Sequence, residues 1–121
     1  MAAVIIDCHD PESLARFWCE LLDLAVVDRL GQPPSVRRLR RQRGCDLTLG
    51  FQCVPENKNV KNRVQLDLEV DDVEAVTSWI EANAGGRAGA DDDEEHGYRL
   101  RVMRDPEGTE FCPWFPTGSR V

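Results

Sequence analysis

The chain has 121 residues, 22 Asp and Glu against 15 Lys and Arg for a net charge of −7, and 41% hydrophobic residues. This length fits one domain, and the hydrophobic fraction argues against intrinsic disorder. The acidic balance disfavours nucleic acid as a partner. With no long apolar run and no signal-like N-terminus, the sequence predicts a soluble, cytoplasmic protein without a membrane partner.

The first half of the chain predicts one strand, one helix and three further strands. Residues 4–8 carry apolar side chains at every second position (Val4, Ile6 and Cys8), as the buried face of a strand does. Asp10 suits a helix N-cap and Pro11 the first helical position, and an apolar stripe at helical spacing follows up to Leu22. Further strands are expected over residues 24–29, 36–41 and 46–54.

The second half repeats this pattern at an offset of 62 residues. Residues 64–70 read as a strand, Asp71 with Glu74 resembles a capping box, and Gly85 with Gly86 is expected to end the helix. Three strands are expected near residues 87–90, 98–104 and 110–115, with a turn at 105–108 before the last one.

Each half therefore reads β-α-β-β-β, with a polar connector around residues 56–62. Neither half could bury its apolar face well alone. We therefore expect a single domain over residues 1–121, built of modules at about 1–57 and 62–117.

The segments HDPESLARFW at residues 9–18, NRVQLDLEVDDVEA at 62–75 and DPEGTEFC at 105–112 resemble the glyoxalase/bleomycin-resistance/dioxygenase superfamily, also called vicinal oxygen chelate. The resemblance covers about residues 3–116. It implies an α+β fold in which two βαβββ modules pair into a curled mixed sheet with a concave cup for ligands.

In the enzymes of that family the cup holds a divalent metal on His and carboxylate ligands. The resemblance places these positions on Ala3, Gln52, Gln65 and Cys112, which offer no such set. No metal or other cofactor is therefore expected at the family position. A displaced metal site made by Asp7, Asp67, Glu69 and Glu110 remains an alternative.

Strand alternation predicts which side chains line the cup. Asp67 and Glu69 should accompany Gln65, Asp7 should accompany Ala3, and Glu110 and Trp114 should accompany Cys112. The predicted ligand-binding residues are Asp7, Gln52, Gln65, Asp67, Cys112 and Trp114. The alternative is that these polar residues satisfy one another or form a subunit contact.

Asp67, Glu69 and Glu110 are the candidates for a catalytic general base. A nucleophilic Cys112 is disfavoured because His9 and His96 lie in predicted loops. The five cysteines (Cys8, Cys19, Cys45, Cys53 and Cys112) contain no CxxC pair, and we expect free, buried thiols.

Two charge clusters stand out. Five arginines crowd residues 37–43, and residues 91–95 form a predicted acidic loop. Both are typical of solvated faces, and the sharper hypothesis pairs them between two copies in a salt-sensitive homodimer.

The sequence thus favours a metal-degenerate protein that binds a small organic molecule in its cup. One alternative is a lyase or isomerase that uses a displaced metal or a carboxylate base. The other is a protein-interaction module.

Overall fold

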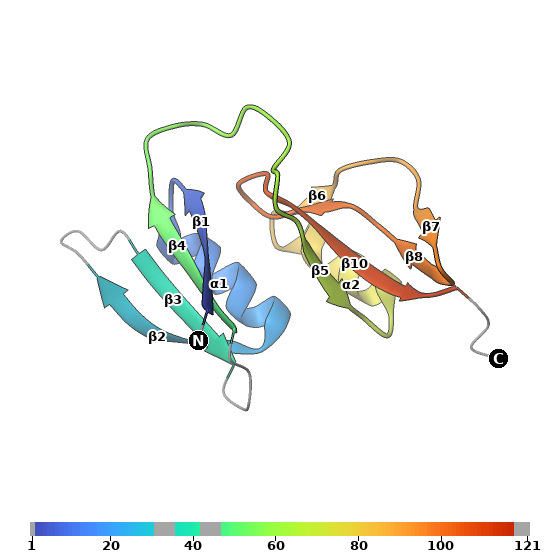
Figure 1. Cartoon of the computed structure of the whole chain (residues 1–121), viewed down its shortest axis with the longest axis horizontal. Coiled ribbons are helices and arrows are strands. Elements are labelled where there is room, and N and C mark those ends of the chain that lie inside the picture. Colours follow the sequence, from blue (N-terminus) through green and yellow to red (C-terminus); the bar gives the residue numbers. More distant parts are fainter. Residues whose placement is uncertain (1, 31–35, 42–46, 118–121) are drawn as a thin grey trace. The chain divides into compact units, whose positions relative to one another are not determined.

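The computed structural model describes residues 2–30, 36–41 and 47–117 (Figure 1). The chain divides into two compact units, Met1–Asn57 and Lys58–Val121. The division falls inside the polar connector around residues 56–62. Neither helix of the described chain is long and apolar enough to cross a membrane.

The first unit follows the order strand, helix and three strands. Its elements are β1 (Ala2–Cys8), α1 (Pro11–Leu22), β2 (Leu24–Leu30), β3 (Val36–Arg41) and β4 (Leu47–Cys53). They form a four-stranded sheet in the order β1-β4-β3-β2, in which β1 runs parallel to β4 and the other pairs are antiparallel. The sequence predicted all five elements to within one residue at most boundaries.

Helix α1 begins and packs as its sequence pattern predicts. The Asp10 carboxylate accepts a hydrogen bond from the Ser13 backbone N at 3.1 Å. Leu14, Phe17 and Trp18 are buried, and Phe51 of β4 is fully buried as well. The apolar stripe of the helix and the inward residues of β4 thus supply the core of this unit.

The second unit repeats the plan with shorter strands. It contains β5 (Leu66–Glu69), α2 (Val73–Ala82), β6 (Gly86–Arg87), β7 (Asp93–Glu95), β8 (Tyr98–Leu100), β9 (Met103–Arg104) and β10 (Glu110–Pro116). The sheet order is β6-β9-β10-β8-β7, and β5 pairs with β10 in parallel. The parallel pair of β5 and β10 thus matches that of β1 and β4.

Three details of this unit differ from the sequence prediction. The N-cap of α2 is Asp72, whose carboxylate accepts from the Ala75 N at 3.0 Å, and not Asp71. Residues 88–90 are not a strand, whereas residues 93–95 of the expected acidic loop are strand β7. The strand expected over 98–104 is interrupted at residues 101–102, between β8 and β9, and the Arg101 side chain binds partners on α2.

Helix α2 also ends differently. Its last residue is Ala82, and the positive φ of 71° at the helix end falls on Ala84 and not on a glycine. Gly85 is needed for a different reason: a Cβ there would lie 2.6 Å from the Arg104 carbonyl oxygen. The double glycine therefore marks a close approach of backbones as well as a helix end.

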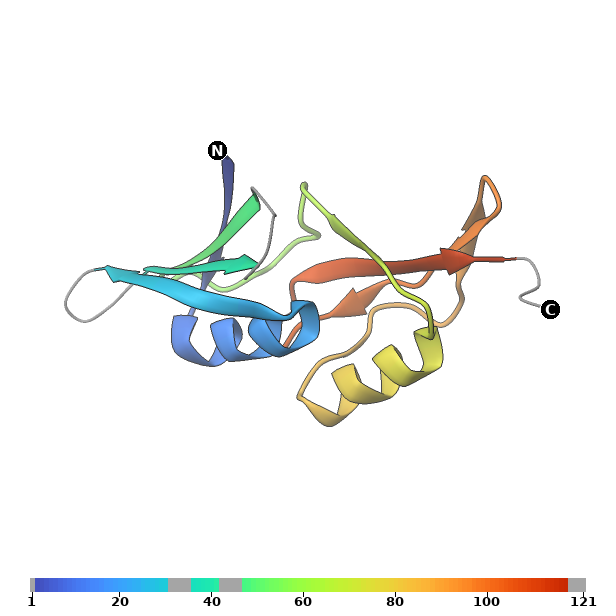
Figure 2. The ribbon, with the colours of Figure 1, turned by 90° about the horizontal axis from the view of Figure 1, so that it is seen from below.

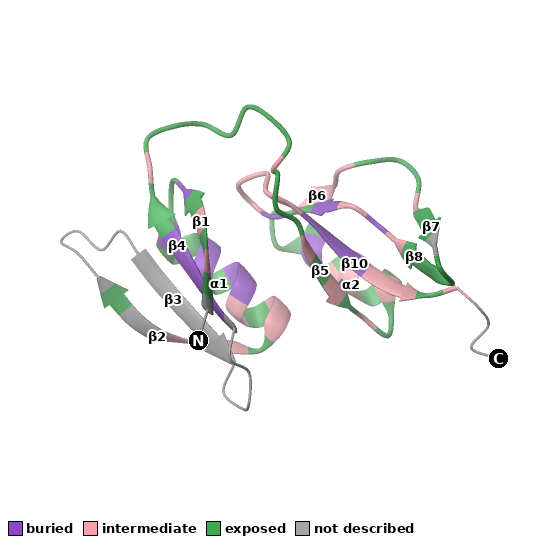
Figure 3. Cartoon of the chain, in the orientation of Figure 1, coloured by how far each residue is buried: buried purple, intermediate pink, exposed green. Residues whose placement is uncertain are grey.

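Each sheet carries its helix on one face, as Figure 2 shows for each unit. Burial alternates along β1 and β5, whereas the central strands β4 and β10 contain consecutive buried residues (Figure 3). In β1, Ile5 and Asp7 are exposed while Cys8 is buried, and in β5 Asp67 and Glu69 are exposed between half-buried leucines. We call the uncovered side of each sheet its open face.

Candidate functional site

One row of paired residues crosses four strands on the open face of the second unit. Asp93 pairs with Leu100, Leu100 with Trp114, and Trp114 with Glu69. Paired residues project to the same face of a sheet. Trp114 therefore has Glu69 beside it on β5, while Asp93 lies two strands away, beyond Leu100; Cys112 and its partner Asp67 are one step further along the same face.

A tight hairpin positions the aromatic part of this face. His96 and Gly97 both have positive φ, at 50° and 84°, as a two-residue turn between twisted antiparallel strands requires. The turn sets Tyr98 so that its ring meets that of Trp114 edge to face, with the ring centroids 4.4 Å apart. Because Tyr98 remains 38% exposed, this pair is accessible to a ligand.

Cys112 lies under this surface as a neutral thiol. Its side chain is buried, and burial, together with the nearby Asp67 charge, raises the pKa of the thiol to about 11. At pH 7 the thiol is therefore protonated. A protonated thiol is a poor metal ligand and a poor nucleophile.

Glu110, which the sequence suggested as a candidate general base, binds residues of the connector through its carboxylate. Its carboxylate accepts a hydrogen bond from the Asn62 N at 3.2 Å and pairs with the Lys58 ammonium at 3.0 Å. Its backbone N and O are also bonded to the Asn62 side chain. Burial acts to raise the pKa of Glu110, but the Lys58 and Asn62 contacts hold it below its usual value.

Glu110 therefore anchors the connector to β10, and its ionised, bonded carboxylate does not suit a general base. Asp67 remains open to a ligand and accepts a hydrogen bond from Gln65 at 3.1 Å. A general-base role for Asp67 or Glu69 stays a prediction.

On the first unit, the sequence-predicted positions Ala3, Asp7 and Gln52 are exposed, and Asp7 pairs with Gln52 across β1 and β4. The register also revises one family position. Ile5 pairs with Gly50 just as Asp67, 62 residues further on, pairs with Cys112. Gly50, rather than Gln52, is thus the fourth-strand equivalent of Cys112, and Gln52 corresponds to Trp114.

On this register, the positions that the family resemblance implies for a metal become Ala3, Gly50, Gln65 and Cys112, which offer one amide and one protonated thiol. Such a set does not fit a divalent cation, which needs imidazole, thiolate or carboxylate ligands. Among the residues that the structure describes, no three His, Cys, Asp or Glu side chains gather in a way that could hold a metal ion.

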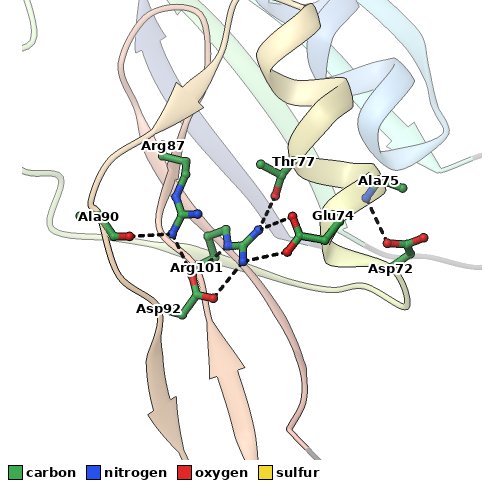
Figure 4. A network of polar contacts seen from close by, with 8 residues as sticks. All are labelled: Asp72, Glu74, Ala75, Thr77, Arg87, Ala90, Asp92 and Arg101. Carbon is green, nitrogen blue, oxygen red and sulfur yellow. Dashed lines mark hydrogen bonds and ion pairs between the residues drawn. The ribbon is translucent and has the colours of Figure 1, made fainter. Parts of the chain in front are cut away.

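A buried arginine, Arg101, which the sequence pattern did not predict, lies on the helix-covered side of the second unit (Figure 4). Arg101 donates to the Asp92 carboxylate at 2.8 and 2.9 Å, to Glu74 at 3.2 and 3.3 Å, and to the Thr77 hydroxyl at 2.9 Å. Arg87 binds the same Asp92 at 3.0 Å. This network joins α2 to the segment that leads into β7.

Only one feature of the sequence could have indicated the network, namely a charged residue inside an apolar stretch at Leu100-Arg101-Val102. The network also changes the interpretation of the acidic run. Asp92 is bound internally, whereas Asp91, Asp93 and Glu94 are exposed. The arginine cluster at 37–43 lies where the structure describes no side chains.

The chain belongs to the glyoxalase-like domain family, whose model matches residues 3–113. No curated protein matches the sequence. The resemblance inferred from the sequence is thus confirmed, together with the α+β fold class.

Similar solved structures support the same fold. One is a glyoxalase/bleomycin resistance protein/dioxygenase family enzyme from Burkholderia phytofirmans PsJN, with a TM-score of 0.71 and 17% identity over 94% of this chain and 96% of that one. A glyoxalase-related enzyme from Fulvimarina pelagi has a TM-score of 0.68 and 21% identity over 98% and 92%. The oxidase ChaP-H2 has a TM-score of 0.68 and 20% identity over 100% and 97%.

Proposed function

We propose that this protein binds a small organic cation carrying a flat apolar group, without a metal, on the open face of the second unit. The observation that carries the proposal is the row in which Trp114 lies beside Glu69 and shares the open face with Asp93 at the other end of the row. One similar structure is named as a glyoxalase/bleomycin resistance protein/dioxygenase family enzyme, and one fold can host different functions.

Different residues of this open face supply the apolar surface and the negative charge that would bind the cation. The edge-to-face pair of Tyr98 and Trp114 offers apolar surface and a negative ring face, which attracts a cation by about 0.5–1 kcal/mol at an exposed site. Asp67, Glu69 and Asp93 add negative charge around it. The neutral thiol of Cys112 lies buried beneath this face and adds no charge of its own.

The proposal is tested with benzyltrimethylammonium and with phenylacetate, an aromatic anion, as probes in calorimetric titrations of metal-free protein. We expect the cation to bind and the anion not to bind. Trp114→Leu should weaken cation binding about two- to fivefold, since it removes an aromatic ring whose attraction for a cation is about 0.5–1 kcal/mol. Asp67→Asn should weaken it several-fold and reduce its dependence on salt.

Glu81→Gln is the matched control, because it also removes one exposed carboxylate but on α2, away from the open face. It should leave binding unchanged. The proposal is wrong if the cation does not bind at millimolar concentration, if Trp114→Leu binds it as the wild type does, or if binding requires an added divalent metal.

A further inference from the structure

Two cysteines of the first unit face each other across neighbouring strands. Cys8 ends β1 and Cys53 ends β4, and the two residues are direct partners in the parallel ladder. Neighbouring strands lie about 4.8 Å apart. This spacing falls within the Cα separation of about 4.4–6.8 Å that disulfides span.

Both thiols lean into the space between the strands. The Cys8 thiol donates to the carbonyl oxygen of Gln52 on the opposite strand, with 3.6 Å between S and O. The Cys53 thiol donates to the carbonyl oxygen of His9 on the other side, at 3.3 Å. The Cys8 side chain is thus directed toward β4, which carries Cys53, and the Cys53 side chain toward the end of β1, which carries Cys8.

The two sulfurs differ in access. Cys8 is 3% exposed, whereas Cys53 is exposed at the end of its strand. An oxidant in solution therefore reaches Cys53 first. Cys8 lies beside it on the neighbouring strand and can react with the oxidised Cys53 to form a disulfide. By contrast, Cys112 belongs to the second unit and has a raised pKa, which disfavours its oxidation.

We propose that Cys8 and Cys53 form a reversible disulfide when the protein meets a peroxide. The Cys53 thiolate attacks one oxygen of hydrogen peroxide and becomes a sulfenic acid, and the other oxygen leaves as water after taking up a proton. The Cys8 thiolate then attacks the sulfenic sulfur, the S–S bond forms, and hydroxide leaves as a second water. A dithiol reductant restores both thiols by exchange.

The bridge would act at the start of the connector between the two units. Val54 N already donates to the Cys8 carbonyl at 2.8 Å, and a His9 ring nitrogen lies 2.8 Å from the Glu56 carbonyl oxygen. Oxidation would make this junction covalent and close a loop over residues 9–52. The first unit should therefore unfold at a higher urea concentration when oxidised than when reduced.

The test treats the folded protein with hydrogen peroxide, alkylates the remaining thiols after unfolding, and maps the digested peptides by mass spectrometry. We expect a peptide pair joined through Cys8 and Cys53 that disappears after dithiothreitol. Cys53→Ser, a surface change, should abolish the joined pair. Cys19→Ser and Cys112→Ser, the matched controls, should keep it.

Three results would overturn the proposal. Cys53 could accumulate as sulfinic acid while Cys8 stays alkylated, Cys53 could join another cysteine such as Cys45 or a second chain, or neither thiol could react. Cys8→Ser is informative as well if it folds, because its Cys53 sulfenic acid should then be oxidised further by the peroxide to sulfinic acid. If it does not fold, Cys53→Ser alone decides.

Discussion

Arg101 shows how one buried charge can organise a unit. Its side chain is 7% exposed and that of its partner Asp92 is 15% exposed, whereas Glu74 is 76% exposed. Removing one member of a buried ion pair leaves the other charge uncompensated. The Arg101 and Asp92 contact should therefore carry most of the free energy of this network, and the Glu74 contact little.

We expect Arg101→Met to lower the free energy of unfolding by about 3 kcal/mol, because it keeps most of the apolar stem but strands the Asp92 charge. Glu74→Gln should cost at most about 0.5 kcal/mol, as is usual for exposed pairs. Urea denaturation measures both. Equal losses in the two variants would contradict the assignment.

Asp92 also makes the folding stability of the protein depend on pH. The hydrogen bonds from Arg101 lower the pKa of Asp92, and this outweighs the opposing effect of burial. In the unfolded chain the pKa is about 3.9, so the unfolded state takes up the proton at a higher pH than the folded state. The resulting stability is present above about pH 4 and is lost as the pH falls below it.

Asp92→Asn should therefore lower stability at pH 7 and flatten its fall between about pH 5 and pH 2. The measurement is the free energy of unfolding against pH for both proteins. Glu110, whose pKa is also lowered, should preserve part of the slope in the variant. Parallel curves for the two proteins would show that Asp92 contributes nothing to the acid response.

The element that follows α2 depends on a glycine for space. A Cβ at Gly85 would meet the Arg104 carbonyl oxygen and the Ile80 Cγ2 atom, each at 2.6 Å, whereas a Cβ at Gly86 would meet nothing within 4 Å. Backbone oxygen cannot move aside as a flexible side chain can. The two glycines therefore form a matched pair.

We expect Gly85→Ala to destabilise the protein by about 1–3 kcal/mol through overpacking between α2 and β9. Gly86→Ala should change stability by less than about 0.5 kcal/mol. Thermal unfolding of the two variants side by side checks this. The steric account fails if Gly86→Ala costs as much as Gly85→Ala.

The elements show where sequence reasoning succeeds. The strand and helix patterns of residues 2–22 are local, and the Asp10-Pro11 start is fixed by backbone chemistry alone, so both could be predicted. The N-cap of α2 was misassigned because Asp71 and Asp72 are both suitable N-cap residues. The sequence alone does not show at which of the two the helix begins. Arg101 could not be predicted, since its partners lie 9 and 27 positions away in sequence.

At the scale of the whole molecule, the 62-residue repeat carried the prediction furthest. It indicated two similar units from a pattern with few identical residues, and the parallel pairing of β1 with β4 and of β5 with β10 has the same register. The same 62-residue offset places Gly50 on Cys112, whereas the alignment of Phe51 with Phe111 that pointed to Gln52 departs from this offset by two residues. The ladders agree with the offset, since they place Gly50 opposite Ile5.

The charge of the whole chain leads to a last prediction, the salt-sensitive homodimer. Two copies with a net charge of −7 repel each other unless opposite patches meet. Asp91, Asp93 and Glu94 are the exposed carboxylates of the acidic run, and the arginines of residues 37–43 are the strongest basic run of the sequence. Sedimentation equilibrium should show dimers at about 0.05 M salt that dissociate at about 0.5 M, where exposed charges are screened.

The variants separate this contact from a general charge effect. Asp91→Asn combined with Glu94→Gln should weaken the dimer at low salt, because both side chains are exposed and neither joins the Arg101 network. Glu20→Gln combined with Glu81→Gln removes the same charge from the helices and relieves general repulsion, so it should leave the dimer intact or tighten it. A monomer at every ionic strength would rule out the homodimer, and equal weakening by both pairs would rule out the acidic run as its contact.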